Sequence, residues 1–140
     1  RVVVTRSEDA AAYCKQRNAE VIIHELPYRS DTVRLGTEHM ENMDGILFCP
    51  CDQPMLSRES LLKLRNAFSF EGKSLLRLAY GDKSAMPALF GKVYYRELKN
   101  LPEGKGGAFI LRNHLMWDFI SRWLNLRGRG LPHRLPALGI

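Results

Sequence analysis

A single carboxylate stands where the chain leaves what reads as a buried strand. The apolar run 45–49 is followed by Pro50 and Pro54, and these two prolines flank Asp52. Proline lacks a backbone donor, so the pair ends sheet pairing and stiffens the loop that carries the acid. An acid beyond the carboxyl end of a strand in an open α/β sheet is a natural ligand for Mg²⁺. Spacing alone favours the plainer interpretation, an ordinary turn in which Asp52 only solvates the strand end.

The elements that must position Asp52 alternate between short apolar runs and helical patterns. This alternation predicts an α/β sandwich, with a parallel sheet, right-handed crossovers and the third and fourth strands in its middle. Ser7 and Ser57 are predicted to cap helices, with acidic residues in the first turns. Strands are predicted at 1–5, 21–24, 45–49, 73–79 and 87–90, and helices at 7–18, 31–43, 57–68, 93–100 and 107–126.

Composition limits the classes of function. The chain of 140 residues fits one domain, assigned to 1–126, with an irregular basic tail at 127–140. Much of the net charge of +6 comes from the arginines after residue 111, and the rest of the chain has no basic stripe interleaved with aromatics, which argues against nucleic acid. No apolar run is long enough for a membrane helix, and the three cysteines read as reduced thiols. We therefore expect a cytoplasmic protein that contacts neither nucleic acid nor membrane.

Four short stretches occur in a set order along the chain: S-D-T-V-R-L-G at 30–36, C-D-Q-P at 51–54, M-P-A-L-F-G at 86–91 and L-P-E-G-K-G-G at 101–107. They resemble the motifs S-x-S-[LI]-R-x-G, G-D-Q-P, G-H-P-V-L-F and G-D-x-G of the nucleotidyltransferases that make molybdenum cofactor dinucleotides. The resemblance is to the MobA-like NTP transferases, in particular the molybdenum cofactor cytidylyltransferase branch.

The resemblance implies a fold, a reaction and a set of site residues. The fold is α/β, a three-layer Rossmann-like nucleotide-diphospho-sugar transferase fold with a mostly parallel sheet and helices on both faces. The reaction transfers CMP or GMP from CTP or GTP to molybdopterin and releases pyrophosphate. The resemblance makes Asp52 the catalytic residue and the Mg²⁺ ligand. It assigns nucleotide or substrate contacts to Ser30, Thr32, Arg34, Gln53, Pro87, Lys105, Gly106 and Gly107.

Two features depart from the family pattern. Family members begin with a further strand and a Gly-rich loop, L-A-A-G-x-S-x-R-x-G, whereas this sequence starts at the next strand. We therefore expect a sheet that lacks the usual first strand, with a homo-oligomer as one way to complete it. The closing D-I-D-T-P segment is also missing, and Asp118 falls in an amphipathic helical pattern instead.

These departures leave catalytic activity open. The alternative is a catalytically inactive, truncated homologue that keeps the sheet and acts as a binding or interaction module. An unrelated doubly wound nucleotide-binding domain is a weaker third interpretation. Two residues also have plainer interpretations. His24 closes a strand and fits a structural histidine better than a base, and Arg34 has an alternative partner in Glu38, one helical turn on.

Overall fold

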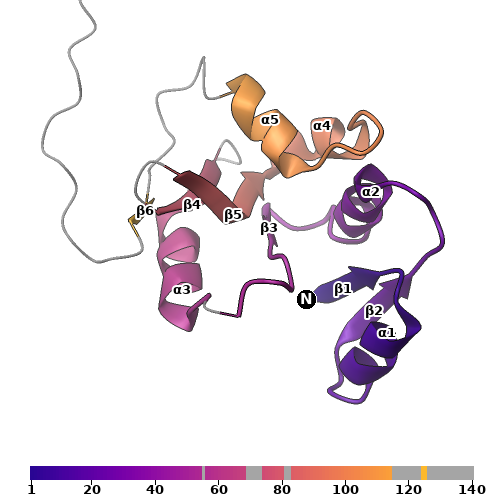
Figure 1. Ribbon diagram of the computed structural model, residues 1–140. Helices are drawn as coiled ribbons and strands as arrows, with labels where there is room; N and C mark the ends of the chain where they lie inside the picture. The colour runs from indigo at the N-terminus through magenta and orange to yellow at the C-terminus, as the bar shows by residue number, and fades with distance from the viewer. Residues whose placement is uncertain (55, 69–73, 81–82, 115–123, 126–140) are drawn as a thin grey trace, which may run out of the picture.

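The computed structural model describes residues 1–54, 56–68, 74–80, 83–114 and 124–125 (Figure 1). The chain opens with β1 (Val2–Thr5), α1 (Glu8–Lys15) and β2 (Glu20–Ile23). The predicted cap is confirmed, because the Ser7 hydroxyl accepts a hydrogen bond from the Ala10 amide at 3.2 Å. The two strands pair in parallel, with Val2 opposite Glu20, as expected for strands joined through a helix.

The remaining elements build a second, larger sheet and its helices. Ser57 caps α3 by accepting from the Ser60 amide at 3.2 Å, which confirms the second predicted cap. The elements are α2 (Arg29–His39), β3 (Gly45–Phe48), α3 (Arg58–Ala67), β4 (Leu75–Tyr80), β5 (Lys83–Gly91), the 3₁₀ turn η1 (Lys92–Tyr94), α4 (Tyr95–Lys99), α5 (Gly107–His114) and β6 (Leu124–Asn125).

The sheet order differs from the predicted one. The larger sheet has the order β3-β5-β4-β6, so β3 lies at its edge and not in its middle. Strand β5 runs antiparallel to both β3 and β4, so the described pairings are half antiparallel and not mostly parallel. For β4 and β5 the reason is the short connection between them, because a few residues can join only antiparallel neighbours.

The predicted last helix is only partly correct. Helix α5 ends at His114, and residues 124–125 form strand β6 beside β4 instead of continuing a helix. The intervening residues 115–123, Asp118 among them, and the predicted tail at 127–140 lie outside the described part of the chain.

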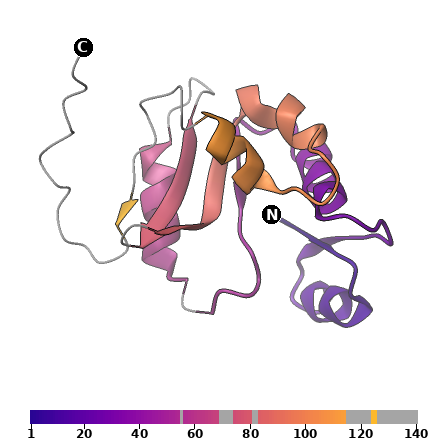
Figure 2. The same cartoon turned by 45° about the horizontal axis from the view of Figure 1, so that its top comes forward.

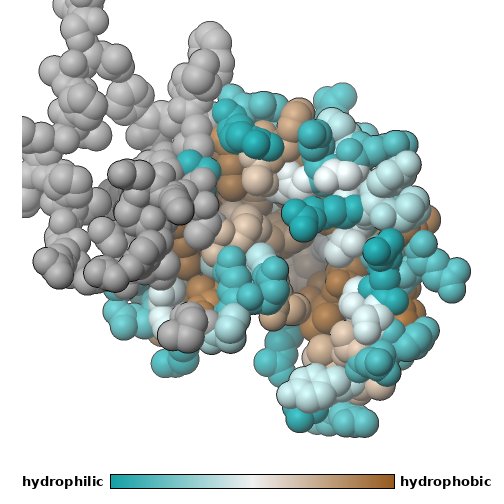
Figure 3. Space-filling view, viewed as in Figure 1, coloured by the Kyte–Doolittle hydropathy of each residue, from teal (hydrophilic) through white to brown (hydrophobic). Residues whose placement is uncertain are grey.

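The two sheets share no strand pairing among the described residues, and α2 packs against both of them. Among the described strands, β1 pairs only with β2, and β3 pairs only with β5. A Cβ atom on Gly36 of α2 would lie 3.4 Å from Val4 and 3.8 Å from Phe48, so both sheets reach the same point of this helix. On the face shown in Figure 3, a notch and apolar surface lie between the small sheet with α1 and the part of the molecule built on the larger sheet.

The main core is centred on Phe90 of β5, whose side chain is fully buried. Its ring meets those of Phe48 and Tyr94 edge to face, with centroids 5.8 and 6.5 Å apart. Helices α4 and α5 supply Leu98 and Ile110 to the same cluster. A second cluster joins Leu64 of α3 to Leu76, Leu78 and Leu89 of the larger sheet. Over the described residues, no helix has the length and apolar character needed to cross a membrane.

The register of β3 shows which of its amides face the free edge. The Lys92 amide donates to the Asp44 carbonyl at 3.0 Å, so this pair is a hydrogen-bonded one. Hydrogen-bonded pairs alternate along an antiparallel ladder, so Ile46 and Phe48 point their amides at β5. The Leu47 amide therefore points away from β5, toward the gap between the sheets.

We predict that hydrogen exchange measured by NMR is faster at the Leu47 amide than at Ile46 and Phe48. The reason is that Leu47 has no strand on that side among the described residues. Equal protection at all three amides would show that another segment pairs with this edge of β3.

A buried phenol ties α4 to the segment before β3. The Tyr95 hydroxyl donates to the Met43 carbonyl at 2.9 Å. Burial, with a smaller contribution from the Asp44 carboxylate, raises the pKa of Tyr95 to about 12. The folded protein therefore holds this proton at a pH where the unfolded chain, with an ordinary tyrosine pKa near 10, has released it.

The free energy of unfolding should fall as the pH rises from 10 toward 12. The contribution of Tyr95 is fully present below pH 10 and is lost as the pH passes through its folded pKa of about 12. Urea unfolding at several pH values should show a smaller fall for Tyr95→Phe than for the wild type. Tyr13→Phe, on an exposed tyrosine, is the matched control. Identical pH dependence in all three proteins would contradict this assignment.

Candidate functional site

The first two turns of α2 carry three of the predicted nucleotide contacts. Ser30 is buried, and Thr32 and Arg34 are half-buried. The helix starts after β2, so its N-terminus lies beyond the carboxyl ends of two parallel strands. That is where open α/β sheets bind ligands, and the positive end of the helix dipole adds an attraction for anions.

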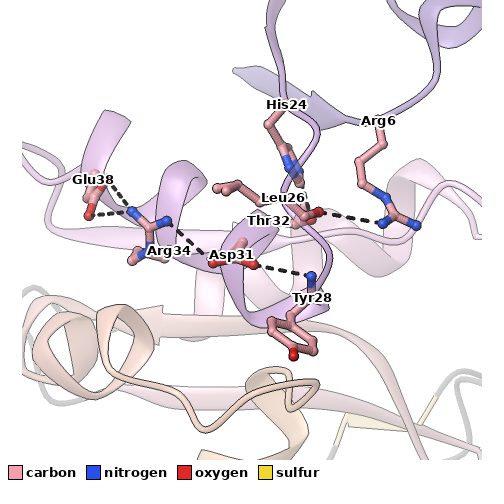
Figure 4. Close-up of polar contacts among 8 residues, drawn as sticks. All are labelled: Arg6, His24, Leu26, Tyr28, Asp31, Thr32, Arg34 and Glu38. Carbon is pink, nitrogen blue, oxygen red and sulfur yellow. Dashed lines mark hydrogen bonds and ion pairs between the residues drawn. The ribbon is translucent and has the colours of Figure 1, made fainter.

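Arg34 is held in place by two carboxylates of its own helix. It lies 3.4 Å from Asp31 and 3.4 Å from Glu38 (Figure 4). The Asp31 contact, with a further contribution from Glu38, raises the pKa of Arg34, so the guanidinium stays charged. The pairing with Glu38 one turn on is confirmed. Asp31 also accepts a hydrogen bond from the Tyr28 amide at 3.1 Å, which satisfies a free donor at the helix start.

Two residues near α2 have roles that the sequence did not reveal. Arg6, directly after β1, donates to the Pro27 carbonyl at 3.2 Å and ties the end of that strand to the approach of α2. His24 follows β2, and its Nε2 atom lies 3.0 Å from the Thr32 hydroxyl (Figure 4). Their position at the carboxyl ends of two parallel strands is the signal that could have singled them out.

The loop before α5 closes one side of this region. The interaction of the Tyr28 hydroxyl with the Glu103 carboxylate raises the pKa of Tyr28. Gly104 has a φ of +70°, a backbone conformation that favours glycine. Gly106 approaches the stem of Arg29, and Lys105 is exposed.

Between this loop and α2 lies a cavity of about 310 Å³. Its lining carries both signs of charge together with a phenol. The charged residues and the phenol are Tyr28, Asp31, Arg34, Lys99 and Glu103. The structure thus brings the 30–36 and 101–107 stretches together.

Asp52 lies apart from this cluster. It is exposed in the turn after β3, next to the half-buried Gln53. No interaction joins Asp52 to α2 among the described residues, and Figure 1 shows the β3 to α3 connection well away from the loop between α4 and α5. Pro87 lies in β5 with a fully buried side chain, so it packs in the interior there.

The described residues offer no ready-made metal cage, because nowhere in them do three potential His, Cys, Asp or Glu ligands come together. The neighbouring Cys49 and Cys51 are free thiols, and burial raises the pKa of Cys49. A metal at Asp52 would therefore take most of its ligands from a bound substrate and water, as Mg²⁺ commonly does.

The MobA-like NTP transferase domain matches residues 1–117. The chain belongs to this family. No curated protein matches the sequence. Membership makes a nucleoside triphosphate the expected substrate class and agrees with the motif order along the chain. The matched residues include the small sheet, strands β3, β4 and β5 of the larger sheet, the N-terminus of α2 and the Asp52 turn, whereas β6 lies beyond them.

Within the MobA-like NTP transferase domain, Gly107 is a glycine with little room for a side chain. A Cβ atom there would lie 2.8 Å from the buried Phe90 ring, whereas one on Gly106 would meet only the flexible Arg29 stem at 3.1 Å. We predict that Gly107→Ala lowers the free energy of unfolding by about 1–3 kcal/mol, because the ring must shift. Gly106→Ala is the matched control and should change it by less than about 1 kcal/mol. Urea unfolding measures both, and equal values would contradict the packing described.

Proposed function

We propose that this chain is a nucleotidyltransferase domain that transfers CMP or GMP from CTP or GTP to molybdopterin and releases pyrophosphate. The observation that carries the proposal is the family match over residues 1–117, with the S-D-T-V-R stretch at the start of a helix beyond two parallel strands. A substrate oxygen on the phosphate of molybdopterin forms the new bond to the α-phosphorus of the nucleotide. The bond from that phosphorus to the pyrophosphate oxygen breaks.

Helix α2 supplies the proposed nucleotide contacts. Ser30 and Thr32 offer hydroxyl groups near the positive end of the helix, and Arg34 offers a guanidinium held by Asp31. A group that is already held in place loses little freedom when a phosphate arrives, which favours binding. Lys105, Gly106 and Gly107 would line the other side of the nucleotide or its acceptor, since the loop that carries them packs beside α2.

Asp52 is the proposed ligand of Mg²⁺. Its exposed carboxylate fits an ion that would take its other ligands from substrate phosphate oxygens and water. The flanking prolines limit the motion of the loop. When bound, Mg²⁺ neutralises triphosphate charge that would otherwise repel the incoming phosphate. Gln53, beside Asp52, would contact the same nucleotide. The remaining catalytic contribution is the positioning of two substrates by the chain.

A second candidate is a catalytically inactive homologue that acts as a binding or interaction module. It is favoured by one observation: among the described residues, Asp52 is not part of the lining of the cavity beside α2. The two candidates differ in turnover, because only the enzyme releases pyrophosphate.

We predict that Asp52→Asn lowers the rate of pyrophosphate release at least about 100-fold, because a neutral amide holds Mg²⁺ poorly. The assay uses CTP and GTP in turn, with Mg²⁺ and molybdopterin. Asp44→Asn, at the other end of β3, is the matched control and should keep most of the activity. Full turnover by Asp52→Asn would remove Asp52 from the mechanism. A wild-type chain that binds nucleotide without turnover would support the second candidate.

A further inference from the structure

Among the described residues, the His24 ring makes one hydrogen bond, and its other ring nitrogen has no partner. Its backbone amide donates to the Thr5 carbonyl at 3.1 Å, which fixes the residue at the end of β2. The Nε2 atom lies 3.0 Å from the Thr32 hydroxyl oxygen (Figure 4). The Nδ1 atom is buried and has no partner among the described residues.

Thr32 behaves differently from the other threonine of α2. Thr37 donates its hydroxyl proton to the Val33 carbonyl one turn back, at 2.7 Å, as helical threonines commonly do. The partner of the Thr32 hydroxyl is His24. The histidine therefore decides where the Thr32 proton points.

The unused Nδ1 atom indicates which tautomer is present. With the proton on Nδ1, the buried site would hold an N–H donor without an acceptor, and such orphaned donors are rare. With the proton on Nε2, the ring donates to Thr32 and only a lone pair stays unused. The Nε2–H tautomer is the favoured one, so the Thr32 oxygen accepts and its proton is free.

The charged neighbours of His24 and Thr32 are occupied elsewhere. Arg6 donates to the Leu26 and Pro27 carbonyls. Asp31 is bound to the Tyr28 amide and to Arg34. Within the described part of the chain, none of these groups hydrogen-bonds to the Thr32 hydroxyl, which leaves its proton available at the start of α2.

We propose that His24 is a positioning residue: its Nε2–H group holds Thr32 so that the threonine hydroxyl donates to an acceptor oxygen of the bound nucleotide. The inference rests on the proposed function, because it assigns that ligand to α2. His24 itself does not touch the nucleotide. Its contribution is to hold the direction of one proton before the ligand arrives, which spares the cost of ordering it on binding.

The first test measures the tautomer and needs no nucleotide. In the ¹⁵N-labelled protein, long-range ¹H–¹⁵N spectra distinguish the two neutral imidazole forms. We expect His24, assigned by comparison with His24→Gln, to be in the Nε2–H form, and we expect Thr32→Val to shift its Nε2 signal. An Nδ1–H form, or a signal that ignores Thr32→Val, overturns the inference.

The second test measures the affinity for CTP and GTP, with Mg²⁺, by calorimetry. Glutamine places an amide donor near the position of Nε2, whereas asparagine reaches only as far as Nδ1. His24→Gln and Thr32→Ser should therefore bind within about twofold of the wild type. The affinity of His24→Asn and of Thr32→Val should be about three- to tenfold lower than that of the wild type. The double variant that combines these two substitutions should lose no more affinity than either single variant.

The outcomes separate the inference from the proposed function. Equal losses of nucleotide affinity in His24→Gln and His24→Asn would show that His24 contributes only packing contacts, and would overturn the inference. Amide spectra of each variant establish that it is folded. If the wild type binds neither nucleotide, the proposed function and the ligand assigned to Thr32 both fail. The tautomer measurement still decides whether His24 donates to Thr32.

Discussion

The packing of one helix against two unconnected sheets is the constraint on which the rest of this structure depends. At Gly36, α2 has no side chain, and this allows Val4 of one sheet and Phe48 of the other to approach the helix together. The same helix packs against α4. A Cβ atom at position 36 would be in ordinary van der Waals contact with both residues, so only a side chain that extends beyond Cβ would have to displace one of the two sheets.

Local signals in the sequence were sufficient for most elements. Ser7 and Ser57 were identifiable as caps because a hydroxyl before a helix satisfies a free amide whatever surrounds it. The pairing of strands was not identifiable in this way. Nothing in the residues of β3 says that it lies at an edge, because its apolar run would suit a buried central strand equally well.

The same distinction holds for the site. The motif order pointed to the start of α2 and to the loop before α5, and the structure brings these two together around one cavity. It could not reveal the contact between His24 and Thr32, because that contact depends on where β2 ends relative to the first turn of α2. The role of Asp52 stays a prediction, since its neighbours in a substrate complex are set by the ligand as much as by the chain.

The split between the sheets has a consequence for any ligand that spans it. The start of α2 and the Asp52 turn belong to parts of the molecule that share no strand pairing among the described residues. If the two parts change their distance, a spanning ligand binds only the fraction of molecules in which the spacing is right, and its apparent affinity is reduced by that fraction. Such a ligand would also hold the two parts at a fixed distance. Each part would then become more rigid when the other is occupied, and two weak half-sites would be coupled through the ligand itself.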